Sequence, residues 1–314
     1  MKDHIVNATK EWFWRRNDNW IARDYELLYT VHGIQPVVEE MDRRFELFSK
    51  RNAVDKKTIT DVDIFEVRTL GQSTHDYEVL ARESIRFIYE LRGTLEYEQR
   101  VIDHVLTWHV SPGKVELIAH RHRAEAVTAF ESLDDGHDTL NFRAYRDHRP
   151  RVPYQRTLAT RYAELWWDRV NPDYLGFHED CTNFVSQVLY SGNIPMHVTE
   201  KRETGWWFRA EPKPNWSYSW SVTHALVNYL RKTSQYVHAS EVHDPKQLQL
   251  GDMISYDWRG SGTYHHMTVV TGFDGNGDPL VNAHTVNSRM RHYSYEDSHA
   301  WTEQTRYLFL HVDD

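Results

Sequence analysis

Cysteine is nearly absent from this sequence, with a single residue, Cys181, among 314. One cysteine cannot form a disulfide within the chain, and zinc sites built from several cysteines are excluded. A lone cysteine is most often a small buried apolar residue. Its local sequence therefore has to decide whether Cys181 has a chemical role.

Long apolar runs and an excess of basic charge are also missing. No stretch is long enough to cross a bilayer, and the first twenty residues carry charges and tryptophans where a secretory signal would need an apolar segment. We therefore expect a cytoplasmic protein without a membrane span, or an extracellular one if a leader has been removed. The net charge of −9 argues against a nucleic-acid partner, because binding phosphates needs clustered Lys and Arg.

Residues 1–130 predict an α+β accessory domain. Apolar residues recur every three or four positions up to about residue 50, which indicates helices. From about residue 58 they alternate with polar ones, which indicates several long strands. Helices followed by antiparallel strands are typical of an α+β fold. This order of elements resembles the NTF2-like superfamily, in which a curved sheet wraps over helices.

A second domain is expected at residues 156–314, after a polar, Pro-containing linker at 131–155. Its patterns predict three helices and three strands, at 156–167, 181–190 and 221–230, and at 251–258, 266–272 and 279–284. The segment Phe273-Asp-Gly-Asn-Gly-Asp predicts a hairpin turn between the last two strands. Asp274, Asn276 and Asp278 alternate as in a calcium loop, but the length and the distal Glu of an EF-hand are absent, so a plain turn is expected.

The position of Cys181 at the start of a predicted helix favours a catalytic role. The helix dipole and the unpaired N–H groups there stabilise a thiolate, and the same donors can hold an oxyanion. A histidine on a strand commonly serves as the base, and His266 opens a predicted strand. His284 lies on the next strand of the same hairpin, where it could orient the imidazole of His266.

A family resemblance supports this interpretation. The stretch Asp180-Cys-Thr-Asn-Phe-Val-Ser-Gln resembles the signature of the putative amidase domain family, a papain-like group related to the NlpC/P60 and CHAP cysteine hydrolases. Other matching stretches are Gly205-Trp-Trp-Phe with Trp216-Ser-Tyr-Ser-Trp, Gly251-Asp-Met-Ile-Ser-Tyr-Asp-Trp, and His266-Met-Thr-Val-Val-Thr-Gly with Asn282-Ala-His-Thr. The resemblance covers about residues 155–314. It implies a helix packed on a small antiparallel sheet, and amide hydrolysis through a thioester by Cys181, His266 and His284.

Several neighbouring residues are alternative or supporting candidates. His265 is a rival base, because strand register cannot be fixed from sequence. Asn282 shares a face with His284 in a regular strand and is an alternative orienter; Asn287 is a weaker one. Asp180 is expected as the N-cap of the helix, and Asn183 as a hydrogen-bonding scaffold residue.

Tryptophan and histidine are abundant, with 12 and 20 residues. Trp206, Trp207 and Trp220 are expected either in the core or in an aromatic groove for a peptide or sugar-linked substrate. No HExxH pair is present, and we expect neither a metal site nor a cofactor. Three histidines, His120, His122 and His137, are predicted to lie at the surface.

The sequence therefore predicts a cysteine amidase or peptidase with a peptide-like substrate, such as one derived from peptidoglycan. An acyltransferase that uses the same Cys–His pair is one alternative, because the acceptor depends on the shape of the cleft. A catalytically inactive binding or scaffold protein is another. The oligomeric state and the role of the N-terminal domain stay open.

Overall fold

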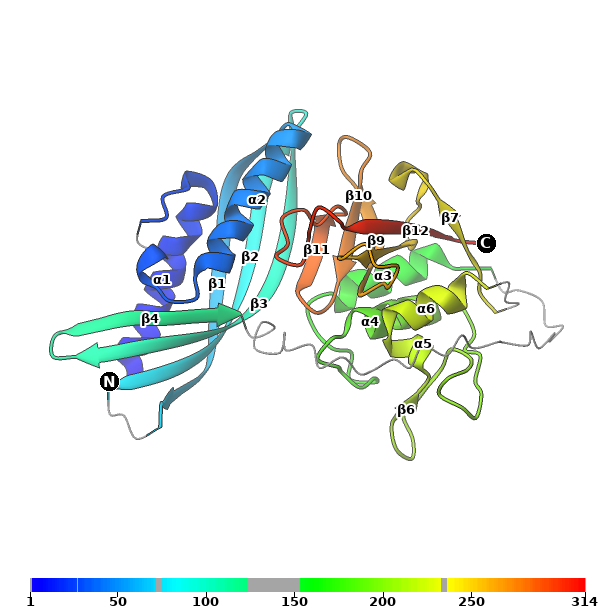
Figure 1. Cartoon of the computed structure of the whole chain (residues 1–314), viewed down its shortest axis with the longest axis horizontal. Helices are drawn as coiled ribbons and strands as arrows, with labels where there is room; N and C mark the ends of the chain where they lie inside the picture. The colour runs from blue at the N-terminus through cyan, green and yellow to red at the C-terminus, as the bar shows by residue number, and fades with distance from the viewer. Residues whose placement is uncertain (1, 27, 72–74, 123–152, 233–235, 314) are drawn as a thin grey trace.

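The computed structural model describes residues 2–26, 28–71, 75–122, 153–232 and 236–313. It shows an α+β protein, in which helices pack on a large antiparallel sheet (Figure 1). The elements of the N-terminal half are α1 (Lys2–Ala22), a 3-10 turn (Leu28–Thr30), α2 (Gln35–Arg51), β1 (Ala53–Thr69), β2 (Asp76–Leu91), β3 (Thr94–Ser111) and β4 (Lys114–His122). The helices and long strands predicted for this half are confirmed.

The C-terminal half alternates short helices and strands. Its helices are α3 (Arg156–Trp166), α4 (Cys181–Ser191), α5 (Tyr218–Ser221), α6 (Thr223–Leu230) and a 3-10 turn (Pro245–Gln247). Its strands are β5 (Phe208–Arg209), β6 (Asn215–Trp216), β7 (Ala239–Val242), β8 (Met253–Asp257), β9 (His266–Phe273), β10 (Pro279–Ala283), β11 (Asn287–His292) and β12 (Arg306–Val312). The predicted helices and the hairpin of β9 and β10 are confirmed, whereas β7, β11 and β12 were not predicted.

One sheet runs through both halves, in the order β1-β2-β3-β11-β10-β9-β8-β12-β7. Strand β3 pairs with β4 along its C-terminal part and with β11 at residues 99–101. Figure 1 shows β11 beside β3, with the helices of each half on their own section of the sheet. The two predicted domains thus share a sheet, and most of the predicted linker, residues 131–152, lies outside the described residues.

Helix α1 packs on the N-terminal strands through a stripe of buried residues. Ile5, Phe13 and Trp20 recur on one helical face and are at most 5% exposed. Ile5 and Phe13 belong to one core cluster with Val79 and Leu106, and Trp20 to another with Phe87. The apolar residues that recur through this helix therefore form the face that packs on the sheet.

The two faces of the C-terminal sheet carry separate cores, and this separation decides the geometry of the candidate site. On one face, Met267 and Val269 pack with Phe184 of α4. On the other, Tyr256 and Val270 pack with residues that include Tyr295. Because side chains alternate along a strand, each residue of β9 can be assigned to one core or the other.

A buried cluster of charges joins the halves. Arg100 of β3 donates hydrogen bonds to Glu40, Glu98 and Asp297, and Arg291 of β11 donates to Asp297 at 2.9 Å. Although burial raises the pKa of Asp297, the guanidinium groups of Arg100 and Arg291 hold it well below its usual range. Buried charges are tolerated only when they are paired in this way.

Within the described residues, no helix is long and apolar enough to span a membrane.

Candidate active site

Cys181 is the first residue of α4 and lies against β9. Every residue of the helix from Cys181 to Leu189 is buried, because the sequence Cys-Thr-Asn-Phe-Val-Ser-Gln-Val-Leu has few charged positions and packs between the sheet and the other helices. Gly192 follows the last turn as the C-cap. The Sγ atom lies 3.8 Å from Oγ1 of Thr182 and 3.9 Å from Oγ1 of Thr223.

The thiol of Cys181 is 4% exposed. Burial raises its pKa, although the backbone N–H of Met267 and the hydroxyls of Thr182 and Thr223 lower it in part. The helix terminus was expected to favour a thiolate, but here desolvation outweighs it. Cys181 therefore rests as a neutral thiol and needs a base at the moment of attack.

The structure does not bring His266 to Cys181. Its neighbour Met267 faces α4, so the side chain of His266 points to the other face of the sheet. There its ring packs among Tyr256, Trp258 and Tyr295, with centroid separations of 5.4, 5.8 and 5.5 Å. Burial, together with the charge of Arg291, lowers its pKa to about 3. His266 is thus a neutral core residue, and the prediction that it is the base has no support in this geometry.

His265 immediately precedes β9. It is two residues before Met267, and its N–H donates to the carbonyl of Tyr256 at 2.9 Å, which extends the ladder between β8 and β9. Burial lowers its pKa, Asp257 and Glu179 raise it, and Arg259 and His224 lower it. Glu179 is two residues before Cys181 and His224 follows Thr223, so two of the charged groups that act on His265 are sequence neighbours of residues at the thiol.

Asp257, at the end of β8, is a candidate that the sequence interpretation did not assign. It is buried, and its carboxylate accepts hydrogen bonds from the N–H groups of Arg259 and Gly262 at 3.2 and 2.6 Å. Although burial opposes it, these backbone donors lower the pKa of Asp257. The signal was present in the segment Gly251-Asp-Met-Ile-Ser-Tyr-Asp-Trp, whose last acid follows the alternating strand.

His284 lies near the start of α4 and contacts neither His265 nor His266 in any described interaction. Its Nδ1 lies 2.7 Å from Oδ2 of Asp180, and its Nε2 lies 2.6 Å from the carbonyl oxygen of Trp166. The ring stacks on Phe184 with a centroid separation of 4.1 Å. Both ring nitrogens are thus used to hold Asp180 and the end of α3, which is a positioning role.

Asp180 occupies the N-cap position of α4, as predicted, but its side chain does not cap the helix. Its Oδ1 accepts instead from the N–H of Phe177 at 2.9 Å and from Nδ2 of Asn183 at 2.8 Å. Asn183 also accepts from Nε1 of Trp220 at 2.7 Å. These bonds fix the turn that leads into Cys181, in line with the scaffold role expected for Asn183.

Asn282 shares the face of His284, but its amide is fully engaged elsewhere. Its Oδ1 accepts from Oγ1 of Thr271 and from the N–H of Met290, at 2.8 and 2.9 Å, and its Nδ2 donates to Oε1 of Glu164 at 2.8 Å. Asn287 lies in β11, opposite Val101. The contacts of Asn282 fasten α3 to the sheet, so the geometry does not support an orienting role for it.

Of the two positions expected for the three tryptophans, core or aromatic groove, the structure shows the core. Trp206, Trp207 and Trp220 are 0%, 1% and 0% exposed. The indole N–H groups of Trp206 and Trp220 donate inside the fold, to Ser186 and Asn183. The tryptophans form the core behind α4.

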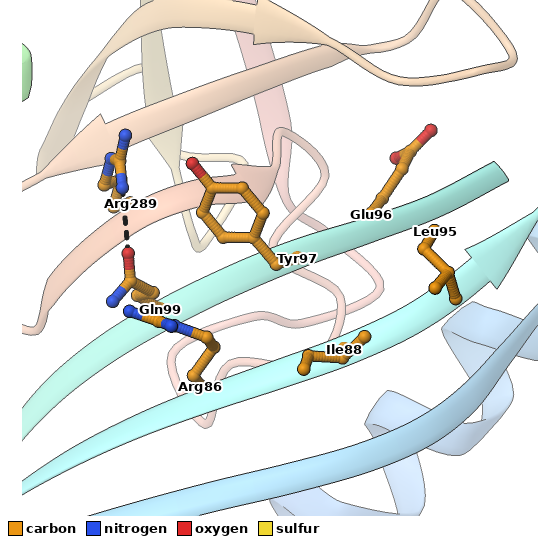
Figure 2. Close-up of a pocket in the computed structure, with 7 residues that line it drawn as sticks. All are labelled: Arg86, Ile88, Leu95, Glu96, Tyr97, Gln99 and Arg289. Carbon is orange, nitrogen blue, oxygen red and sulfur yellow. Dashed lines mark hydrogen bonds between the residues drawn. The ribbon is translucent and has the colours of Figure 1, made fainter.

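The pocket in Figure 2 lies away from Cys181, where β11 meets β3. It is lined by Arg289 of β11 and by residues of β2 and β3, which are Arg86, Ile88, Leu95, Glu96, Tyr97 and Gln99. Arg289 donates to Oε1 of Gln99 at 2.9 Å, as Figure 2 shows. This pocket therefore belongs to the junction of the two halves and not to the candidate site.

The turn at Phe273–Asp278 is a plain hairpin turn, as expected. Oδ1 of Asp274 accepts from the N–H groups of Asn276 and Asp278, both at 2.8 Å, and Oδ2 accepts from Arg51 of α2 at 2.8 Å.

The prediction of surface histidines is wrong for His120 and His122, which are 2% and 6% exposed. His137 lies outside the described residues.

Comparison with known proteins agrees with a hydrolase-type domain around α4. The model of the family described as "Putative amidase domain" matches residues 153–310, and the chain belongs to this family. The uncharacterized protein YhbB of Bacillus subtilis (strain 168) is 34% identical over 280 residues, which cover 87% of this chain and 86% of that protein. A second uncharacterized protein of that organism, YjcM, is 27% identical over 142 residues, or 43% of this chain and 31% of YjcM. No solved structure matches significantly.

The family match places the amidase region on the elements that surround Cys181, from α3 to β12. The link to papain-like and NlpC/P60 enzymes, and that of the N-terminal half to the NTF2-like superfamily, has no structural neighbour to support it.

Proposed function

We propose that this protein hydrolyses an amide bond with Cys181 as nucleophile and His265, not His266, as the base. The observation that carries this proposal is the alternation of β9. Met267 has its backbone N–H at the thiol and its side chain packed with residues of α4, while the ring of His266 packs among aromatic side chains on the opposite face. If the alternation continues one residue before the strand, His265 shares the side of Met267 and Cys181.

The resting protonation states fit general-base catalysis. Burial favours the neutral form of both groups, because it raises the pKa of Cys181 and lowers that of His265. His265 would accept the thiol proton as Sγ attacks the carbonyl carbon, and would then donate that proton to the leaving amine. A water molecule, deprotonated by His265, would cleave the thioester and release the carboxylic acid and the thiol.

Backbone N–H groups at the start of α4 are available to stabilise the oxyanion of the proposed intermediate. Cys181 and Thr182 are the first two residues of α4, whose leading N–H groups have no acceptor within the helix. Such groups can stabilise the tetrahedral intermediate. Asp257 would act on His265 through its charge, because it is the acidic residue that most strongly raises the pKa of this histidine.

The substrate class that fits best is a peptide-like amide, with peptides derived from the cell wall as the first candidates. In this proposal the C-terminal half is a papain-like hydrolase region, and the N-terminal half, with its two helices on a long sheet, is an NTF2-like accessory region.

The test is turnover of peptidoglycan-derived peptides and simple peptide amides, followed by mass spectrometry. We expect the parent protein to release an amine, and Cys181→Ala to release none. Addition of a free amine distinguishes hydrolysis from acyl transfer, since only acyl transfer gives a product that carries the added amine. Equal turnover by the parent and by Cys181→Ala would refute the nucleophile assignment, and no turnover of any amide would favour a binding protein.

A further inference from the structure

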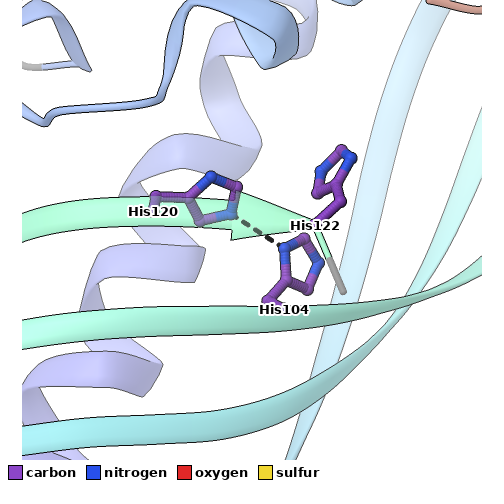
Figure 3. Close-up of side chains that lie close together, drawn as sticks. All are labelled: His104, His120 and His122. Carbon is purple, nitrogen blue, oxygen red and sulfur yellow. Dashed lines mark hydrogen bonds between the residues drawn. The ribbon is translucent and has the colours of Figure 1, made fainter. Parts of the chain in front are cut away.

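Three histidines from β3 and β4 meet under α1, far in the sequence from the candidate active site. His104 pairs with His122 in the register of these strands, and His120 is two residues before His122, so all three project from one face. Figure 3 shows the three rings turned toward one another. Each offers a ring nitrogen, and these nitrogens lie within 4.8 Å of one another.

Ordinary core packing does not explain this cluster. His104, His120 and His122 are 1%, 2% and 6% exposed, and the rings of Phe13 and Trp12 cover His104 and His120 at centroid distances of 4.9 and 5.4 Å. Buried polar atoms are nearly always paired. Nδ1 of His104 and Nε2 of His120 lie 2.9 Å apart and share one hydrogen bond, whereas Nδ1 of His120 has no partner within the described residues.

The spacing of the nitrogens suits a tetrahedral metal ion. Zinc binds imidazole nitrogens at about 2.0–2.1 Å, so two of its ligand atoms lie about 3.3–3.4 Å apart. The separation of 2.9 Å between His104 and His120 would have to widen by a few tenths of an ångström, which small ring rotations supply. His122 closes the third corner from the last position of β4.

A carboxylate stands behind the first ligand. Oε2 of Glu83 lies 3.3 Å from Nε2 of His104, on the side of the ring opposite Nδ1. Metal-binding histidines commonly direct their second nitrogen to a carboxylate, which fixes the tautomer. Arg16 lies close to the cluster, but its charge is compensated by the buried ion pair with Glu83. Burial lowers the pKa of the three imidazoles, which keeps them in the neutral form that binds metals.

We propose that His104, His120 and His122 bind one first-row transition-metal ion, zinc(II) in the first place. Three imidazoles suit borderline ions such as zinc, whereas magnesium and calcium need oxygen ligands. The ion would link the end of β4 to the middle of β3, and a water molecule would complete its tetrahedral coordination beside the three imidazoles. From the sequence we expected no metal site, because no HExxH pair is present. The pairing of β3 with β4, which brings the three histidines together, could not be seen in the sequence.

The test measures metal content and metal binding of the full chain. Protein treated with a chelator is dialysed against zinc, and the bound metal is determined by elemental mass spectrometry. We expect one zinc per chain, resistant to excess magnesium, and loss of this stoichiometric zinc in His120→Gln and His122→Gln. The matched control is His109→Gln. His109 lies on β3, the strand of His104, but its side chain is 41% exposed and is paired with Asp76. Cys181→Ser should also keep its zinc.

A second measurement covers the case in which the variants do not fold. Cobalt(II) added to the apo parent should give the visible absorption of tetrahedral coordination, and zinc should abolish this absorption. Zinc should also raise the thermal unfolding midpoint of the parent and leave that of a folded His120→Gln protein unchanged. A parent that binds no stoichiometric zinc and gives no tetrahedral cobalt spectrum would overturn the proposal, as would one zinc per chain retained by the folded double variant His120→Gln/His122→Gln.

Discussion

The two adjacent histidines of the segment Tyr-His-His-Met give opposite predictions when each is replaced. In His265→Gln the protein loses the proposed base, and we expect amide turnover to fall by about 100- to 10,000-fold, the usual range for a general base. In His266→Phe a neutral ring is replaced by an apolar one within a cluster of aromatic side chains. We expect turnover within a few-fold of the parent.

The stability of the two variants should differ as well. Nε2 of His266 is buried without a hydrogen-bond partner among the described residues, and such an atom costs about 1–3 kcal/mol. His266→Phe removes that cost and should leave the free energy of unfolding equal or higher by about 1 kcal/mol. Urea denaturation followed by tryptophan fluorescence measures the difference.

Alkylation of the single cysteine by iodoacetamide provides an assay that needs no substrate. With a pKa above the ordinary value of about 8.5, less than about 3% of Cys181 is thiolate at pH 7. We expect slow alkylation of the parent near neutral pH, a rise only in alkaline solution, and a further decrease near pH 7 in His265→Gln alone. The reasoning is refuted if His266→Phe abolishes turnover while His265→Gln retains it.

Three further predictions concern the fold. Asp297→Ala removes the carboxylate that Arg100 and Arg291 share and should lower the free energy of unfolding by about 3 kcal/mol in urea, the lower end of the range for a broken buried ion pair, because Glu40 and Glu98 still accept from Arg100; a loss below about 1 kcal/mol would contradict the role given to the cluster. Trp220→Phe removes the N–H that donates to Asn183 and should lower the free energy of unfolding by about 1–3 kcal/mol. An unchanged free energy of unfolding would contradict a role for this hydrogen bond. The pKa of His266 is about 3 in the folded protein and about 6.5 when unfolded. Above pH 6.5 this residue is neutral in both states, so it adds no pH dependence. Below pH 6.5 the unfolded chain takes up a proton that the folded protein does not, and the free energy of unfolding therefore falls, by about 2 kcal/mol at pH 5. The unfolding free energy of His266→Phe should therefore depend less on pH between 7 and 5, and an identical dependence in the two proteins would refute this assignment.

Periodicity was sufficient to predict the elements that carry one buried face. The helices at the start of the chain follow from it, because their apolar residues recur with the period of a helix. The β9–β10 hairpin, which is buried on both faces, was predicted from its turn segment. The segment of β11, Asn-Ser-Arg-Met-Arg-His, lacks this alternation. It is held by pairing on both sides and by ion pairs such as Arg291 with Asp297, which only the assembled fold provides.

The region of the candidate site was predictable, since the family match covers it, whereas the nucleophile and the base stay predictions. A one-residue change of strand register moves a side chain to the opposite face, and nothing local distinguishes His265 from His266. The packing of Met267 with residues of α4 favours His265 over His266 in the proposal. Sequence order likewise could not show that His284 would use both ring nitrogens on Asp180 and Trp166, nor that β3 and β4 would bring His104 to His120 and His122.

The pairing of β11 with β3 sets a limit on how this protein can be divided. The family match begins at residue 153, yet a fragment cut there would turn β11 into an exposed edge strand and would remove Arg100, one of the two arginines that pair with Asp297. Unpaired edges invite association between chains, and the loss of this ion pair would weaken the same region. The segment recognisable as an amidase is therefore smaller than the segment able to fold, and a gene fusion or excision that respects only the former should yield aggregates.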